Sequence, residues 1–270
     1  EETVLNHVES VIEAHPDSAL TLLRGGDKAS LGSDREKAQY ALLMSMALDK
    51  NYIDTTTFDV IQPAIDYYLD IDNVTPDDKL RTYYYQGRIF QNQGDRDNAL
   101  NSFVKGLDIS SESNDSLSVA RTFVASGGIY EEFYDFDSYT TSYLKAAIIY
   151  KDLSLKWNEF DCLLNALNGA ILLGNKPKGD SIMALCNGFG DLDNEQKLSL
   201  PGYRLSHALK FEDISKIKQL IGCQEDNYNL DTNGLLNLAR AYYKLGDYVK
   251  AKNLLNHINN NRPEYDILKY

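Results

Sequence analysis

The sequence predicts an all-α protein, a right-handed solenoid of stacked helical hairpins. Three observations support this prediction. Apolar residues recur every three or four positions along most of the chain, as they do on one face of an α-helix. Turn residues such as Gly-Asp pairs interrupt these stretches at short intervals. No stretch alternates apolar and polar residues as a half-buried strand does, and no low-complexity linker divides the chain.

The clearest hairpin runs from Leu235 to Pro263. Its first helix has apolar residues at positions i, i+3, i+4 and i+7, namely Leu235, Leu238, Ala239 and Tyr242. Gly246-Asp247 then ends this helix, because glycine tolerates the left-handed geometry of a helix end and aspartate caps the next start. The second apolar stripe comprises Val249, Ala251, Leu254, Leu255 and Ile258.

This stretch resembles a tetratricopeptide (TPR) repeat, whose signature is W-x2-L-G-x2-Y, then A-x3-F, then P. Leu235 stands in place of the usual Trp and Leu255 in place of the Phe. Ala239 and Ala251 hold the small positions where two helices approach closely. Because one hairpin cannot bury its own hydrophobic face, the resemblance implies neighbouring hairpins and a TPR-like superhelix over residues 1–270.

The beginning of the chain predicts a cap and a divergent hairpin. Residues 1–26 are expected to form N-terminal capping helices, since the segment HPDSALTLL keeps the Pro, Ala and Leu placement of a TPR second helix. Residues 34–71 predict a hairpin whose first helix starts at Ser33-Asp34 and ends near Lys50. Its second helix is expected after Thr55, with Pro63 bending it or shifting its start.

Three long repeats are predicted at 76–110, 115–152 and 156–187, spaced by about 40 residues. In the first repeat the small, large and turn places are Gly87, Phe90, Gly94, Ala99, Phe103 and Gly106. Residues 40 positions later are Gly127, Tyr130, Tyr134, Tyr139, Tyr143 and Ala146, where Tyr139 takes a usually small place. The residues a further 40 positions along the chain fit this pattern poorly. A short hairpin at 200–222, the clear repeat at 231–262 and the start of a further helix at 263–270 complete the array.

Composition narrows the classes of function. The chain has 270 residues, is 43% hydrophobic and 25% charged, and has a net charge of −13. This acidity argues against a general nucleic-acid or anionic-membrane surface. The sequence contains no apolar run of about 18 residues, so it predicts no membrane-spanning helix. Three cysteines without CxxC spacing, Cys162, Cys186 and Cys223, indicate core residues rather than a zinc site. Both ends lie within helical patterns, so we expect a fragment of a longer protein.

No catalytic, cofactor or metal motif is convincing. The segment GNKPKGDS has the Gly-x4-Gly frame of a phosphate loop, but Asp180 stands where the Lys must be and would repel phosphate. The four histidines are too far apart in sequence to form a local ligand set. Neither a G-x-S-x-G elbow nor a cysteine beside a base occurs. The sequence therefore predicts a protein that is not an enzyme and that needs no cofactor.

The resemblance implies that the first helices of successive hairpins line a concave groove for peptides or helices. By spacing, the candidate groove residues are Arg81, Tyr84, Arg88, Gln91, Asn92, Arg121, Glu131, Asn168, Asn233, Arg240, Tyr243 and Lys244. Arginines on one face of an acidic protein suit an acidic peptide. The alternative is that they are ordinary solvated charges. The clamp for chaperone C-terminal carboxylates is not implied, because its Lys and Asn places hold Tyr84 and Arg88.

The opening helices and the Tyr-rich repeats are also similar to a group of bacterial envelope proteins that carry a signal peptide or lipid anchor. This resemblance implies an extracytoplasmic protein-binding scaffold. A sensor ectodomain of a membrane-anchored helix-turn-helix transcriptional regulator and a cytoplasmic adaptor are the alternatives. The partner is expected to be a protein or peptide and not a nucleic acid, and the oligomeric state stays open. Charge reversal at Arg81 and Arg88 is expected to weaken partner binding without changing helix content.

Overall fold

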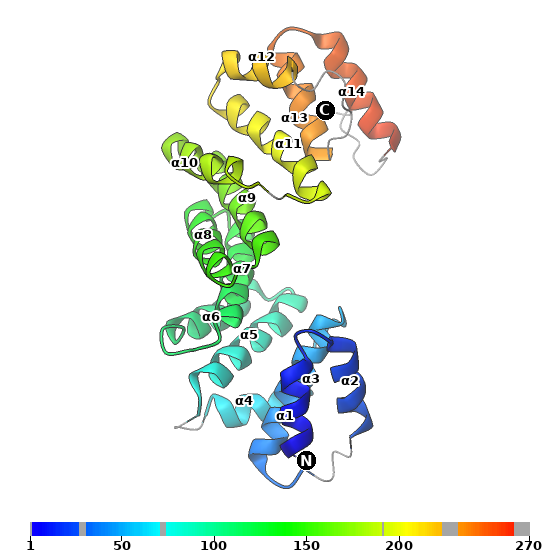
Figure 1. The fold of residues 1–270 in the computed structure, drawn as a ribbon, viewed down its shortest axis with the longest axis vertical. Helices are drawn as coiled ribbons and strands as arrows, with labels where there is room; N and C mark the ends of the chain where they lie inside the picture. The colour runs from blue at the N-terminus through cyan, green and yellow to red at the C-terminus, as the bar shows by residue number, and fades with distance from the viewer. Residues whose placement is uncertain (1, 27–30, 71–73, 191, 223–231, 262–270) are drawn as a thin grey trace. The chain divides into compact units, whose positions relative to one another are not determined.

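The computed structural model describes residues 2–26, 31–70, 74–190, 192–222 and 232–261 (Figure 1). Throughout these ranges the regular structure is helical, and the helices pack as consecutive hairpins, so the predicted all-α fold is confirmed. The chain forms two compact units, Glu1–Phe133 and Tyr134–Tyr270. We call them the N-terminal unit and the C-terminal unit.

The N-terminal unit begins with three helices that pack on one another, and each helix after them packs against the one before it in the chain (Figure 1). Its helices are α1 (Glu2–Val11), α2 (Pro16–Gly25), α3 (Asp34–Lys50), α4 (Gln62–Tyr68), α5 (Pro76–Asn92), α6 (Arg96–Asp108) and α7 (Ser116–Glu132). Those of the C-terminal unit are α8 (Phe136–Asp152), α9 (Lys156–Leu173), α10 (Lys176–Asn187), α11 (Asn194–Lys210), α12 (Ile214–Gly222), α13 (Thr232–Lys244) and α14 (Tyr248–Asn261).

Tight turns that contain a residue in the left-handed conformation connect the two helices of several hairpins. Gly94, Gly174 and Gly246 have φ angles of +78°, +71° and +85°, and each precedes a residue whose side chain caps the next helix. Tyr134, 40 residues after Gly94, is also left-handed, with φ +58°. The left-handed residues Gly94, Tyr134 and Gly174 thus follow one another at intervals of 40 residues, and Gly94 and Gly246 occupy the same kind of turn. The boundaries of the repeats stay a prediction.

Helix starts in the divergent hairpin follow local chemistry. Ser33 and Glu36 form a capping box at the start of α3, where the sequence placed it. Helix α4 begins only at Gln62, with Pro63 in its first turn. Because proline lacks the N–H that a helix interior needs, it is accommodated where no such bond is required. Of the two predicted effects of Pro63, the structure has the shifted start.

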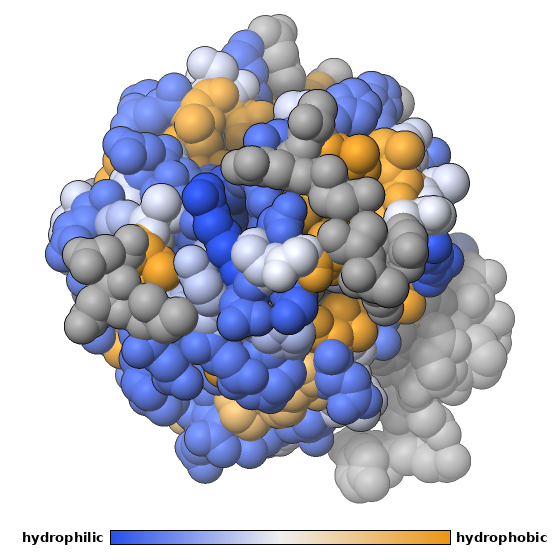
Figure 2. Space-filling model, turned by 90° about the horizontal axis from the view of Figure 1, so that it is seen from below, coloured by the Kyte–Doolittle hydropathy of each residue, from blue (hydrophilic) through white to orange (hydrophobic). Residues whose placement is uncertain are grey.

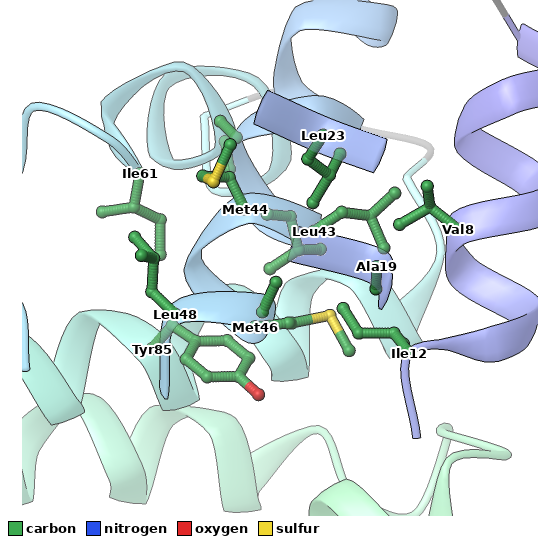
Figure 3. Close-up of a cluster of buried hydrophobic side chains, with 14 of the residues drawn as sticks. Val8, Ile12, Ala19, Leu23, Leu43, Met44, Met46, Leu48, Ile61 and Tyr85 are labelled. Atoms are coloured by element: carbon green, nitrogen blue, oxygen red, sulfur yellow. The ribbon is translucent and has the colours of Figure 1, made fainter. Parts of the chain in front are cut away.

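The core of the first three helices is made by apolar faces pointing at α3 (Figure 3). Val8 of α1 and Ile12, directly after this helix, are almost completely buried there, as are Ala19 and Leu23 of α2. Burying a large aliphatic side chain contributes about 1.5–3 kcal/mol. Helix α1 is thus a permanent part of this core.

Small residues permit close helix packing in both units. A Cβ atom at Gly87 of α5 would collide with the ring of Phe103, which is fully buried. In the C-terminal unit the large Tyr139 occupies a usually small place, and Gly169 of α9 makes room for its ring. The Tyr139 hydroxyl donates to Asn165 Oδ1 at 3.1 Å. The glycine opposite therefore compensates for the tyrosine that departs from the repeat pattern.

Helix α11 differs most from expectation. The sequence predicts a short helix from Tyr203 to Leu209 within a hairpin at 200–222, whereas α11 starts at Asn194 and has Pro201 inside it. A proline and the polar segment before it hide a helix start from pattern reasoning. Cys223 and the helix predicted at 263–270 lie outside the described residues.

The face drawn in Figure 2 is largely hydrophilic, and apolar residues reach it only as separate patches. Among the described helices, none combines the length and apolar character that a bilayer span requires.

Candidate functional site

The predicted groove residues fall on four helices. Those of the N-terminal unit lie on α5 and α7, and those of the C-terminal unit lie on α9 and α13. The two groups have different surroundings.

In the N-terminal unit, acidic residues of the chain itself pair with all three of the predicted arginines, Arg81, Arg88 and Arg121. Arg81 Nη1 lies 2.7 Å from Glu9 Oε1, and its Nε lies 2.5 Å from Asp115 Oδ2. Arg121 donates through two nitrogens to the Glu13 carboxylate, at 2.9 and 2.8 Å. Glu9 belongs to α1, Glu13 follows this helix and Asp115 caps the start of α7, so the counter-charges come from distant parts of the unit.

The pKa of Glu13 reflects this arrangement. Burial alone would raise it, but the hydrogen bonds and charges of Arg121 and Lys50 outweigh burial and lower the pKa to about 2. Lys50 Nζ lies 2.8 Å from Glu13 Oε2. This carboxylate is therefore a fixed negative charge between two cations at neutral pH.

Other predicted groove residues of α5 hold the helix to its neighbours. Arg88 donates to Asp49 at 3.1 Å and to Gln91 at 2.7 Å, while the Asn92 amide donates to the Thr55 carbonyl at 3.0 Å. Tyr84 packs edge-on against Tyr85, with ring centroids 4.9 Å apart. Burial raises the pKa of Tyr84 to about 12. Each of these side chains already has a structural role.

Glu131 lies at the exposed end of α7. Its neighbour Glu132 pairs with Arg96 of α6. Partner binding by the seven predicted residues of this unit stays a prediction, but the structure gives six of them intramolecular contacts.

In the C-terminal unit, two adjoining clefts lie along α13. The first, which we call the polar cleft, has a volume of about 360 Å³ between α9, α11 and α13. It is lined by Asn168, Ile171, Leu172, Ser199, Gly202, Tyr203, Ser206, Asn233, Leu236, Asn237 and Arg240. All predicted groove residues of this unit except Tyr243 and Lys244 line it.

The second, which we call the apolar cleft, has a volume of about 600 Å³ between α11, α13 and α14. It is lined by Leu209, Leu236, Ala239, Arg240, Tyr243, Lys244, Ala251 and Leu255. Leu236 and Arg240 line both clefts, which makes the two continuous. We call them together the α9–α13 groove.

Polar side chains of the groove have unused hydrogen-bonding capacity. Asn237 donates to the Gly202 carbonyl and accepts from Arg240 Nη1, both at 3.3 Å. Within the part of the chain that the structure describes, the side chains of Asn168 and Asn233 make no hydrogen bond. Tyr243 is 67% exposed, and its ring lies 5.2 Å from that of Tyr248.

The sequence analysis missed the contribution of α11, because the start of this helix was placed too late and the predicted part, from Tyr203 to Leu209, was not assigned to the groove. Ser199, Tyr203 and Ser206 lie on one face of this helix and line the polar cleft. Their spacing of four and then three residues is the helical signal that would have found them.

Reactive groups elsewhere have ordinary structural surroundings. Cys162 and Cys186 are buried free thiols, and burial raises the pKa of each to about 12, which leaves little nucleophilic thiolate. His207 Nε2 lies 3.3 Å from Asp180 Oδ1, and burial lowers its pKa. The described residues contain no group of three His, Cys, Asp or Glu side chains arranged to hold a metal ion.

Comparison with known proteins agrees with this architecture. Residues 234–265 match the family model for the tetratricopeptide repeat. The chain therefore contains a TPR repeat. The matched residues include most of α13 and the predicted signature residues. A search of curated proteins found no significant match.

Solved structures with the same fold include three of different kinds. A Rap protein complexed with competence and sporulation factor is 14% identical, with a TM-score of 0.56 over 97% of this chain and 76% of that one. BtubC from P. vanneervenii is 13% identical, with a TM-score of 0.52 over 95% and 91%. A STAND signal-transduction ATPase with a TPR sensor, from Pyrococcus horikoshii, is 14% identical, with a TM-score of 0.61 over 97% and 42%. The fold is TPR-like.

Proposed function

We propose that this chain is a non-catalytic binding module that holds a peptide segment of its partner in the α9–α13 groove. The observation that carries the proposal is the polar cleft, where the side chains of Asn168 and Asn233 face open space without intramolecular hydrogen bonds in the described structure. A side-chain amide has both a donor and an acceptor. It therefore pairs with the backbone of an extended peptide whatever the peptide's side chains are.

The position of the groove supports this function. It is formed by α9, α11 and α13, the first helices of consecutive hairpins, which is the surface that TPR-like arrays present to partners. Its volumes, about 360 and 600 Å³, are in the range of ligand sites. The Rap protein, which has a similar fold, was solved in complex with competence and sporulation factor, and this supports a binding role for such a fold.

The test uses the full chain and an array of acetylated, amidated octapeptides of defined sequence. We expect a subset of peptides to be retained, and the double variant Asn168→Ala/Asn233→Ala to bind them about tenfold more weakly, since each lost hydrogen bond contributes about 0.5–1.5 kcal/mol. Asn253→Ala, at an exposed position of α14, is the matched control. Equal affinity of the double variant and the control would exclude the groove, and an array without retained peptides would exclude the function.

For the cellular setting we propose the extracytoplasmic segment of a bacterial envelope protein, on the resemblance of the opening helices and Tyr-rich repeats alone. A sensor ectodomain of a membrane-anchored regulator and a cytoplasmic adaptor are the competing proposals. Sequencing the gene on both sides separates them. An upstream signal or lipid-attachment sequence supports the envelope, and a downstream membrane span with a helix-turn-helix module supports the regulator. A gene with neither favours the adaptor.

A further inference from the structure

We infer that the peptide is recognised by a carboxylate directly beside a large apolar side chain. The carboxylate pairs with Arg240, and the apolar side chain enters the apolar cleft. This inference rests on the proposed function and specifies its ligand.

The first step concerns the charge of Arg240. Its side chain is exposed, and its Nη1 donates to the neutral Asn237 oxygen at 3.3 Å. Among the residues that the structure describes, no carboxylate lies within ion-pair distance of it. Since a guanidinium has five N–H donors in a planar fork, most of the binding capacity of Arg240 remains for a ligand.

The second step concerns the rest of the groove. The other cation that lines it, Lys244, is paired with Glu212 at 2.9 Å. No described residue that lines either cleft is an Asp or a Glu, although the chain has 40 of them. A ligand carboxylate would meet an acidic protein with a net charge of −13, and within the groove it meets a cation instead. Charge complementarity therefore favours an acidic ligand here.

The third step concerns spacing. Leu236 and Arg240 are one helical turn apart on α13, and both line both clefts. Leu209, Ala239, Ala251 and Leu255 continue the apolar cleft directly from this point. A ligand carboxylate at Arg240 thus lies beside the apolar cleft. Its apolar residue must be the adjacent residue or the next one along the peptide.

The predicted groove arginines of the N-terminal unit are not equivalent anchors. Arg88 holds the place of Arg240, six residues before the turn glycine, but it is paired with Asp49 at 3.1 Å. Arg81 and Arg121 are bound by Glu9, Asp115 and Glu13. The apolar residues of α1 beside these acids are buried in the core, so a ligand does not replace this helix readily.

The experiment compares matched peptides on the full chain. A positional-scanning octapeptide array, acetylated and amidated, is expected to select Asp or Glu at one position and Leu, Ile, Met or Phe within two residues of it. In solution, by fluorescence anisotropy, changing that Asp to Asn is expected to weaken binding about tenfold, as for loss of a charged hydrogen bond. A further peptide carries Asn in place of the Asp but ends in a free C-terminal carboxylate. If this peptide recovers the affinity, the group recognised is the terminal carboxylate rather than a side-chain one.

Variants of the protein complete the test. Arg240→Glu is expected to reverse the selection from Asp to Lys, and Tyr243→Ala to weaken binding of the apolar residue about threefold, since the substitution truncates a wall of the apolar cleft. Lys252→Glu, an equal charge change at an exposed site outside both clefts, is the control. If Asp and Asn peptides bind equally, or Arg240→Glu keeps the Asp preference, the inference fails while peptide binding stands. A groove filled by a second copy would instead give a dimer in sedimentation that Arg240→Glu dissociates, which would also overturn the inference.

Discussion

The two units place arginines at corresponding faces of their first helices, yet use them differently. In the N-terminal unit, Arg81 and Arg121 are bound by acids that come from α1, the turn after it, and the start of α7. In the C-terminal unit, Arg240 has only an amide oxygen as partner among the described residues. A shared repeat pattern therefore places the cation, and distant parts of the chain decide whether it stabilises the fold or remains available for a ligand.

The largest expected difference is in stability. Arg81 and Asp115 have side chains that are only 19% and 13% exposed. Arg81→Met leaves the carboxylates of Glu9 and Asp115 without their cation, and we expect it to reduce the free energy of unfolding by about 2–3 kcal/mol, below the value for a fully buried pair. Arg240→Met is expected to change it by about 0.5 kcal/mol or less.

Urea unfolding of the full chain measures both. The one tryptophan, Trp157, belongs to the C-terminal unit, so its fluorescence reports that unit while circular dichroism reports all helices. The Arg81 variant should shift the circular dichroism transition and leave the fluorescence transition in place. Equal effects of the two variants would remove the distinction between the units. From this structure we expect charge reversal at Arg81 and Arg88 to lower the helix content, contrary to the expectation from the sequence. The reversed side chains would lie as like charges beside Glu9 and Asp49.

A smaller effect is expected from pH. The pKa of Glu13 is about 2 in the folded chain and near its ordinary value of 4.5 in the unfolded chain. Because the folded value is the lower one, its stabilising contribution is complete above pH 4.5 and is lost as the pH falls toward 2. The Glu13 side chain is 43% exposed, so solvent screening leaves a contribution of about 1 kcal/mol.

The measurement is the thermal midpoint of the full chain and of Glu13→Gln between pH 5 and pH 2. The difference between the two proteins should be largest at pH 5 and should shrink toward pH 2. Glu159→Gln, at a partly exposed position of the C-terminal unit, is the control and should leave the pH dependence unchanged. A constant difference between Glu13→Gln and the parent chain across this range would show that the Arg121 pair does not hold the carboxylate charged.

Local features were predictable from the sequence, and long-range pairings were not. Caps and turns such as Ser33, Gly94 and Gly246 depend on neighbouring residues, so their spacing sufficed to place them. The contacts Arg81–Glu9 and Arg121–Glu13 join residues 72 and 108 positions apart, and no periodicity encodes them.

The same limit applies to packing and to the groove. The glycine that accommodates Tyr139 lies on another helix, at Gly169, so the tyrosine looked like a poor fit to the repeat. In the groove, Asn168, Asn233 and Arg240 were found by spacing because they belong to helices with clear patterns. Ser199 was missed because Pro201 obscured the first part of α11, whereas Tyr203 lay in a predicted helix that was not assigned to the groove.

The smallest expected effect concerns the second cation of the groove. Glu212 forms an exposed ion pair with Lys244, as Glu13 does with Arg121 in the N-terminal unit. Glu212→Gln frees the Lys244 ammonium beside the apolar cleft. Binding of the acidic octapeptide should then strengthen about twofold, the size expected for one exposed charge, and the gain should disappear at high salt. Fluorescence anisotropy at two ionic strengths measures it, with Glu159→Gln as the control for the loss of one negative charge elsewhere in the unit. A gain of the same size in the control would mean that net charge, rather than the groove cations, governs recognition of the peptide.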